Sequence, residues 1–323
     1  MSTSIDLYHH DLSLPRPFSK ILSSEIANGN ASPDTVKTYR QQFKLFASWC
    51  DRQRLDITQL GENQIKEYRG YLVAQGLKVA TIALKLTVIR RIFDIAVARG
   101  ILPVNPALRV KPPTERRDPA TRNNYLELDE AQQLVNSLPT GSSVKELRDR
   151  LLVVLMVVQG CRQIELYRLN VGDVIRRKDK VGIRVRGKGS IRVVPLKADV
   201  ANLLALYIKA RKSSGEKLKP SRAMFISFSP NVAGKLENRL TRTSMQRIVN
   251  HYLEAARLKH SENRTVTTHG LRHTVGYLLQ TAGKPLRVIQ EFLGHADPRT
   301  TAIYAHIASL WSDNPVTSIN IFV

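Results

Sequence analysis

Cysteine, aromatic residues and long apolar runs are all scarce in this chain of 323 residues. Its two cysteines, Cys50 and Cys161, are too few for a disulfide framework or a cysteine-rich metal site, which is typical of a reducing compartment. The most apolar run, residues 151–158, is far shorter than the roughly 20 residues that cross a bilayer, so it predicts a buried helix. The N-terminal MSTSIDLYHH lacks the pattern of a secretory signal, and we expect a cytoplasmic protein with no membrane partner.

Acidic residues are also in short supply. The chain has 27 of them against 50 Lys and Arg, a formal net charge of +23. The basic residues are spread along the whole sequence, which predicts a positive folded surface and a polyanionic partner, most commonly nucleic acid. Binding to a membrane surface fits this spread less well. There is no GxxxxGK[ST] loop for a nucleotide, and we expect neither a metal nor an organic cofactor.

Proline, glycine and apolar periodicity divide the chain into five stretches. Residues 1–30 show little periodicity and are expected to form a partly ordered arm. Apolar residues then repeat at helical spacing through residues 31–110, which predicts a small all-helical domain. The proline- and charge-rich segment KPPTERRDPATR, residues 111–122, is typical of an interdomain linker. A second domain, mostly helical with a small antiparallel sheet, is predicted for residues 123–310, and a tail follows at 311–323.

Three amphipathic helices are predicted in the first domain. The first begins near Pro33, and the third ends at Gly100. Basic side chains on their exposed faces fit an ordinary solvated surface, and with this net charge they fit contact with phosphates equally well. The residues concerned are Lys37, Arg40, Lys44, Lys78, Lys85 and Arg90.

Two features of the second domain place basic residues beside apolar elements. The apolar helix ends at Gly160, and Arg162 follows two residues later. An arginine there needs a partner or a function: either an ion pair with Glu165 at the domain surface, or a role in a site.

Further on, residues 181–195 alternate apolar and basic residues and turn at GKGS, which predicts a β-hairpin. Lys188 lies at its tip, suited to entering a DNA groove or simply solvated.

The segment from residue 267 to residue 306 concentrates the chemically active side chains. His269 and Arg272 are three apart, so they lie side by side on a helix that Thr267 or Thr268 can cap. Gly283 and Gly294 are predicted to end two successive helices, which leaves His295 on a tight turn. A third short helix beginning near residue 297 carries Tyr304.

Two kinds of site remain open for this segment. His269 and His273 have the spacing of zinc ligands on a helix, with His295 as a third. Arg272 argues against a cation, because a guanidinium repels one and instead grips a phosphate with two parallel hydrogen bonds. We therefore favour a site that binds and cuts a phosphodiester.

Taken together, these residues resemble the tyrosine recombinase family, the integrases and the Xer-type or Cre-type site-specific recombinases. The resemblance covers about residues 30–310. The matching motifs occur in the family's order: GCRQIEL at 160–166, GKG at 187–189, HGLRH at 269–273, LGHAD at 293–297, and Tyr304 with His306.

The resemblance implies both a fold and a mechanism. The fold is mainly α with a small antiparallel β-sheet, in which a helical core-binding domain and an α+β catalytic domain form a C-shaped clamp on DNA. Tyr304 would attack the scissile phosphate, giving a 3′-phosphotyrosine link and a free 5′-hydroxyl. Arg162, Arg272 and His295 would hold the phosphate oxygens, Lys188 would protonate the leaving oxygen, and His269 would assist proton transfer. Glu165 and His273 match supporting positions.

The resemblance also implies the partners. These are double-stranded DNA with a specific recombination site, and further copies of the chain, two on one site and four in the synapse, joined by the C-terminal tail. Ile319, Ile321 and Phe322 give that tail apolar side chains for docking on a neighbour. The protein would then be associated with the nucleoid. A type IB topoisomerase-like enzyme and a non-catalytic DNA-binding protein of the same fold are the alternatives.

Overall fold

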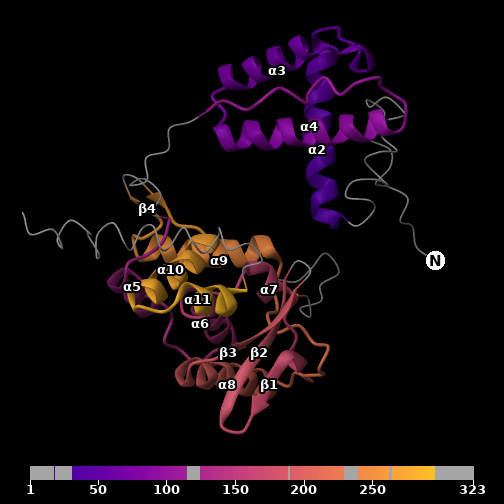
Figure 1. Cartoon of the computed structure of the whole chain (residues 1–323). Coiled ribbons are helices and arrows are strands. Elements are labelled where there is room, and N and C mark those ends of the chain that lie inside the picture. The colour runs from indigo at the N-terminus through magenta and orange to yellow at the C-terminus, as the bar shows by residue number, and fades with distance from the viewer. Residues whose placement is uncertain are drawn as a thin grey trace, which may run out of the picture. The chain divides into compact units, whose positions relative to one another are not determined.

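A computed structural model describes residues 18, 31–114, 124–187, 190–228, 239–261 and 264–294. The chain divides into two compact units between Arg117 and Asp118, and each is described by itself. Both are built mainly of helices, and the second also holds a small antiparallel sheet (Figure 1), which confirms the predicted fold class. None of the described helices has the length and apolarity to cross a membrane.

The first unit contains the three predicted helices, α2 (Pro33–Arg52), α3 (Glu62–Ala74) and α4 (Val79–Ala98), with a short 3₁₀ turn at Ile57–Gln59. Ser32 caps α2 by accepting the backbone N–H of Thr35. Aromatic rings fill the space between the helices, and the Phe46 ring lies edge-on to Tyr68, with centroids 4.9 Å apart. Their burial gives this unit a core of its own.

The basic residues of this unit differ in exposure. Lys37, Lys44 and Lys78 are exposed and Arg40 is partly buried, but the prediction that Lys85 lies on an exposed face is wrong. Lys85 is 7% exposed, because it lies on the apolar side of α4, and its Nζ donates to Gln42 Oε1 on α2 over 2.8 Å. Arg90 is partly buried and donates to the carbonyls of Ala107 and Val110, so it holds the segment after α4.

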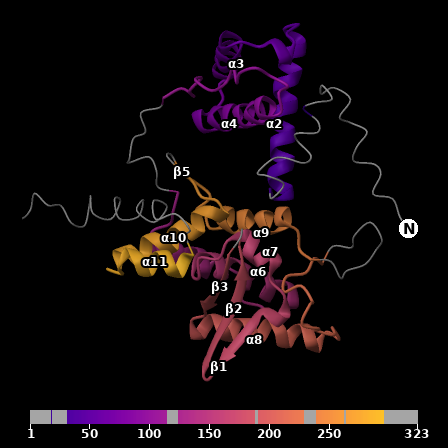
Figure 2. The same cartoon turned by 45° about the vertical axis from the view of Figure 1, so that its right-hand side comes forward.

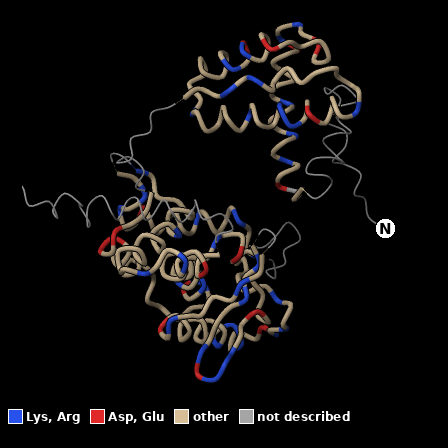
Figure 3. The backbone as a smooth tube through the Cα atoms, in the orientation of Figure 1, with Lys and Arg blue, Asp and Glu red and all other residues tan. Residues whose placement is uncertain are grey.

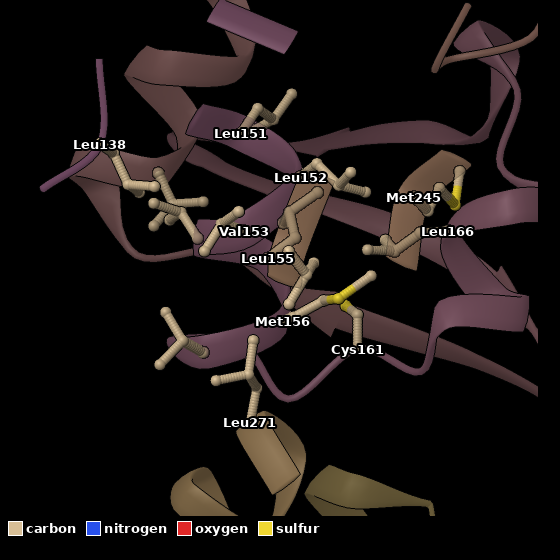
Figure 4. Close-up of a cluster of buried hydrophobic side chains, with 14 of the residues drawn as sticks. Leu138, Leu151, Leu152, Val153, Leu155, Met156, Cys161, Leu166, Met245 and Leu271 are labelled. Atoms are coloured by element: carbon tan, nitrogen blue, oxygen red, sulfur yellow. The ribbon is translucent and has the colours of Figure 1, made fainter. Parts of the chain in front are cut away.

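Helix α6 (Val144–Val157) is the centre of the second unit. Every residue from Leu151 to Val157 is buried, which confirms the interpretation of the apolar run. Figure 4 shows side chains of this helix packed among Leu166, Met245 and Leu271, which come from three other segments. The helices packed around α6 are α5 (Leu128–Asn136), α8 (Ala198–Ser213), α9 (Arg242–Ala255) and α10 (Thr268–Thr281).

The sheet has three antiparallel strands in the order β1 (Val174–Arg177), β2 (Lys180–Arg186) and β3 (Ile191–Pro195). The predicted hairpin is β2–β3, with Ile183 opposite Val194. β1 was not predicted, because only two apolar residues precede its basic end. Its turn into β2 is mostly blue in Figure 3.

Two shorter extended features lie in the described part of this unit. The apolar segment at residues 224–228 forms no strand, only a single bridge between Ile226 and Arg239. A two-stranded sheet, β4 (His260–Ser261) with β5 (Arg264–Thr265), leads into α10.

Three helices position the residues singled out by the sequence: α7 (Gln163–Arg168), α10 and α11 (Leu286–Leu293). Figure 2 shows α10 and α11 as neighbours, and the two helices are in contact. Helix α11 ends at Gly294, whose φ of 62° is in the left-handed region that favours glycine. The glycines at which helices were predicted to end, Gly160, Gly283 and Gly294, all have positive φ.

Candidate active site

The site begins where α6 ends. Gly160 has a φ of 64°, which turns the chain directly into Arg162, the N-cap residue of α7. A Cβ at Gly160 would lie only 2.7 Å from Leu293 Cδ2, so this turn passes close beneath the end of α11. The tight passage brings the Arg162 motif and the segment preceding His295 together.

Arg162 uses both its backbone and its side chain to hold this junction. Its backbone N–H donates to Glu165 Oε2 over 2.8 Å, and its Nη1 donates to Glu165 Oε1 over 2.9 Å. Its Nη2 donates to the carbonyl of Gly294 over 2.9 Å. The ion pair with Glu165 that the sequence left open therefore exists, but with the carboxylate buried, because the Glu165 side chain is 1% exposed and that of Arg162 is 26% exposed.

A second arginine, absent from the sequence-based prediction, also holds Glu165. Arg192 of β3 donates from Nη2 to Glu165 Oε2 over 2.9 Å and from Nε to Oε1 over 3.3 Å. Burial by itself would raise the pKa of Glu165, but the charge and hydrogen bonds of Arg192, with the N–H of Arg162, hold that pKa below its ordinary value. The sequence held one indication of this role. Arg192 lies opposite buried Val185, at a position where strand alternation predicts an apolar residue, so a basic residue there needs a buried partner.

Arg272 is 1% exposed and comes from the first turns of α10. Its Nη1 donates to the carbonyl of Gly160 over 2.5 Å, and its Nη2 donates to the carbonyl of Leu293. A buried guanidinium is tolerated only when its donors are used, and these two bonds tie the end of α6 to the end of α11. Arg162 and Arg272 thus hold two consecutive carbonyls, those of Leu293 and Gly294.

His269 and His273 lie one turn apart on α10, which Thr267 caps by accepting the N–H of Gly270. Their rings meet edge to face with centroids 4.6 Å apart. His269 keeps part of its surface in solvent. Partial desolvation of its ring, and then the charges of Arg272 and Arg162, lower its pKa. Burial, then His269 and Arg272, lower the pKa of His273 to about 4. Both imidazoles are therefore neutral at pH 7.

The two histidines were also the basis of the zinc alternative. Within the described ranges no group of three or more His, Cys, Asp or Glu has an arrangement that could hold a metal ion. His295, the third ligand of that alternative, is not among the described residues. Arg272, whose charge acts on both rings, makes a cation unfavourable there.

The tip of the β2–β3 hairpin starts beside the same carboxylate. Lys188 is outside the described residues, but Gly187 before it is described. The Gly187 carbonyl accepts from Arg168 Nη1 over 2.6 Å, and its N–H donates to the carbonyl of Ser190 over 2.8 Å. A Cβ at Gly187 would lie 3.8 Å from Glu165 Oε1. The base of the turn that carries Lys188 is therefore next to Glu165.

Of the predicted site residues, the structure brings together Arg162, Glu165, His269, His273 and Arg272. Tyr304 and His295 lie in a segment that the structure does not describe, and Gly294 is the last described residue before them. Among the assembled groups, Arg162 and Arg272 are cationic donors whose charges act on the Glu165 carboxylate, and the two imidazoles are neutral. Such fixed donors suit a phosphate, whose oxygens gain charge during transfer, because they need no rearrangement at the moment of reaction.

Comparison with known proteins gives matches over both units. Residues 124–310 match the phage integrase family, and residues 22–100 match the N-terminal SAM-like domain of phage integrases. The tyrosine recombinase XerC of Vibrio vulnificus is 30% identical over 296 residues, which is 91% of this chain and 87% of that protein. The tyrosine recombinase XerD of Staphylococcus epidermidis is 30% identical over 280 residues, 86% of this chain and 89% of that protein.

Solved structures share the fold. The XerH site-specific recombinase bound to a palindromic difH substrate matches with a TM-score of 0.70 and 22% identity, over 91% of this chain and 82% of that one. A lambda integrase dimer bound to a COC′ core site matches with a TM-score of 0.65 and 17% identity, over 90% of this chain and 94% of that one. The catalytic-domain match alone covers more than half of the sequence. The chain therefore belongs to the phage integrase family, the tyrosine site-specific recombinases.

Proposed function

We propose that this recombinase cleaves and rejoins DNA through a covalent 3′-phosphotyrosine formed by Tyr304, with release of a 5′-hydroxyl. One observation carries the proposal: Arg162 and Arg272, from different elements, are anchored on the carbonyls of Gly294 and Leu293, directly before His295 in the chain. Such a pair gives a phosphate two positive forks at one place. Ten residues after Gly294 the chain reaches Tyr304.

Each remaining residue has a role that its chemistry supports. The hydroxyl of Tyr304 has an ordinary pKa of about 10, so its attack needs a base and a positive neighbourhood. The exposed, neutral imidazole of His269 suits proton transfer at the tyrosine. Lys188 is proposed as the acid for the leaving 5′-oxygen, and His295 as a further phosphate donor. Glu165 and His273 orient Arg162 and His269 through the contacts described above.

Energy conservation explains why such a reaction needs no nucleotide. The phosphotyrosine link keeps the energy of the broken phosphoester, so attack by a 5′-hydroxyl reseals the strand. The guanidinium groups supply positive charge that a metal ion supplies in other phosphoryl-transfer sites. By analogy with oxyanion-hole donors, removal of either arginine is expected to cost about 3 kcal/mol of transition-state stabilisation.

The alternatives are less well supported than recombination. Both relatives described above are named tyrosine recombinases, and they cover nearly the whole of this chain. A topoisomerase-like enzyme would relax a supercoiled plasmid without exchanging partners, so a plasmid that carries two copies of the site separates the two activities. A non-catalytic DNA-binding protein would have no use for the Arg162–Glu165–Arg272 arrangement.

We propose double-stranded DNA and further copies of this chain as the partners, which places the protein at the nucleoid. The lambda integrase structures support this, since one is a dimer on a core site and another is a tetramer bound to a Holliday junction. Residues 31–110 and 123–310 would clamp the duplex, with 111–122 as the linker. Residues 311–323 would dock on a neighbouring copy. Deletion after Asn314 should therefore abolish synapsis; intact assembly and recombination would refute this role.

Covalent capture tests the mechanism. The protein is incubated with sheared chromosomal DNA from its source, denatured, and the attached DNA is sequenced to identify the site. A duplex of that sequence is then nicked next to the cleavage point, so that the released fragment diffuses away and the adduct accumulates. Wild type should give an adduct stable to denaturing electrophoresis, and Tyr304→Phe should give none. Absence of the wild-type adduct, or an adduct from Tyr304→Phe, would overturn the mechanism.

A further inference from the structure

Arg192 joins three elements around the site, although it is not among the residues to which the proposed mechanism gives a role. It lies on the buried face of β3, and its side chain is 12% exposed. Two of its nitrogens hold the Glu165 carboxylate on α7, and its Nη1 donates to the carbonyl of Phe292 at the end of α11 over 2.7 Å. This uses the whole planar fork of the guanidinium on two fixed acceptors.

The hydrogen bond from Arg192 to α11 continues the pattern made by the other two arginines. Three consecutive carbonyls at the end of α11, those of Phe292, Leu293 and Gly294, accept from Arg192, Arg272 and Arg162 respectively. A Cβ at Gly294 would lie 2.7 Å from Arg192 Cδ, so the arginine stem passes directly against this turn. Arg192 therefore restrains the residue that immediately precedes His295.

Charge balance gives Arg192 a second effect. Glu165 is 1% exposed and carries one negative charge, which faces both Arg162 and Arg192. With both arginines present the group has a net charge of +1. Without Arg192, the carboxylate would cancel the charge of Arg162, and it would also hold Arg162 more tightly because burial strengthens electrostatic attraction.

We propose that Arg192 is a positioning residue of the cleavage reaction: it neutralises Glu165, so that Arg162 keeps its positive charge for the phosphate, and it fixes the end of α11 before His295. This inference rests on the proposed function. Arg192 itself contacts no reacting atom in the proposal and acts through Arg162 and through the Phe292–Gly294 turn.

The test measures the single-turnover rate of adduct formation on the nicked duplex, with DNA affinity and thermal unfolding recorded for every variant. Arg192→Gln should cleave about 10- to 100-fold more slowly, by analogy with residues that orient the ligands of a metal site. Its DNA affinity should remain close to that of wild type. Arg192→Lys should fall between the two, because an ammonium keeps the charge but cannot hold both acceptors in one plane.

A double variant separates charge balance from general damage to the fold. Arg192→Gln combined with Glu165→Gln removes one positive and one negative charge, so Arg162 again gives the group a net charge of +1. The double variant should therefore cleave faster than Arg192→Gln alone. A purely structural role predicts the reverse, since the second substitution would add to the damage. Arg177→Gln, at an exposed arginine of β1, is the matched control and should cleave at the wild-type rate.

Each outcome decides the inference. Arg192→Gln cleaving at the wild-type rate, or a double variant no faster than Arg192→Gln, would overturn it. If Arg192→Gln does not fold, Arg192→Lys takes its place, and a wild-type rate for that variant would overturn the inference equally. Failure of the proposed function is distinct, because in that case wild type itself forms no adduct.

Discussion

At the scale of single residues, the three arginines of the site differ in how much of each side chain is exposed to solvent. Arg272 is 1% exposed and Arg192 has a side chain that is 12% exposed, and both hold backbone carbonyls of α11. The Arg162 side chain is 26% exposed, which leaves part of its guanidinium accessible. Arg162 is therefore the arginine of the three that is most accessible to an incoming phosphate.

The two neutral histidines make stability depend on pH. The pKa of His273 is about 4 in the folded chain against an ordinary 6.5, so the unfolded chain binds the proton more readily. The stability that the neutral His273 ring contributes is fully present above pH 6.5 and is lost as the pH falls towards 4. Between pH 7 and pH 4.5 wild type should lose about 2 kcal/mol more stability than His273→Gln.

Urea unfolding of the two proteins at each pH measures this difference. Carboxylates titrate in the same range in both proteins, so only the difference between the two curves reports on His273. Parallel loss of stability in wild type and His273→Gln would contradict the expectation.

At the scale of elements, the end of α11 is the point on which the site is assembled. Its last carbonyls accept from arginines of α7, α10 and β3, elements that are far apart in the sequence. Gly294 makes this possible, because its left-handed φ of 62° ends α11 at that residue, and because a side chain there would strike Arg192.

Gly294→Ala tests this role, with Gly283→Ala as its matched control. Both glycines have left-handed φ, 62° and 70°, so each alanine should cost about 1 to 2 kcal/mol of stability. Around Gly283 a Cβ meets nothing within 4 Å, whereas at Gly294 it would displace Arg192. We expect slow adduct formation only for Gly294→Ala. Equal cleavage rates for the two variants would show that the turn does not position the arginines.

At the scale of the whole molecule, each unit has its own apolar core, and basic residues are found over both (Figure 3). The excess of positive charge is therefore a property of two separately folded bodies. A duplex that contacts both units loses condensed counterions at both contacts, which makes the affinity depend strongly on salt concentration.

Exposed and buried lysines of the first unit should behave differently in this respect. Lys37 and Lys78 are exposed, so their joint replacement by Gln should weaken binding to any duplex and reduce the slope of log affinity against log salt by up to about 2. Lys85→Gln should lower thermal stability and leave that slope unchanged, because Lys85 is buried against Gln42. Binding titrations over a series of salt concentrations measure both. An unchanged slope for the double variant would exclude these lysines from phosphate contact.

Patterns that are local in the chain were readable from the sequence. Helical periodicity and glycine stops predicted α2, α3, α4, α6, α10 and α11, and strand alternation predicted the β2–β3 hairpin. The motif residues Arg162, Glu165, His269 and Arg272 were identified through their resemblance to the family's motifs, and phosphate chemistry alone favoured only Arg272 beside His269. Lys85 was misassigned because lysine is usually exposed, whereas its position three residues after Ile82 and four before Ile89 places it on the buried face of α4, against α2.

The sequence by itself determined the elements, the family and the chemical types of the site, since periodicity, capping and motif spacing depend on neighbours along the chain. Only the tertiary structure decided which acceptors those side chains use. Arg192 and the carbonyls of α11 are separated by about a hundred residues, and their contact depends on the packing of β3, α7 and α11. The physical reason is that a buried charge takes its partner from whatever folding brings within hydrogen-bond reach.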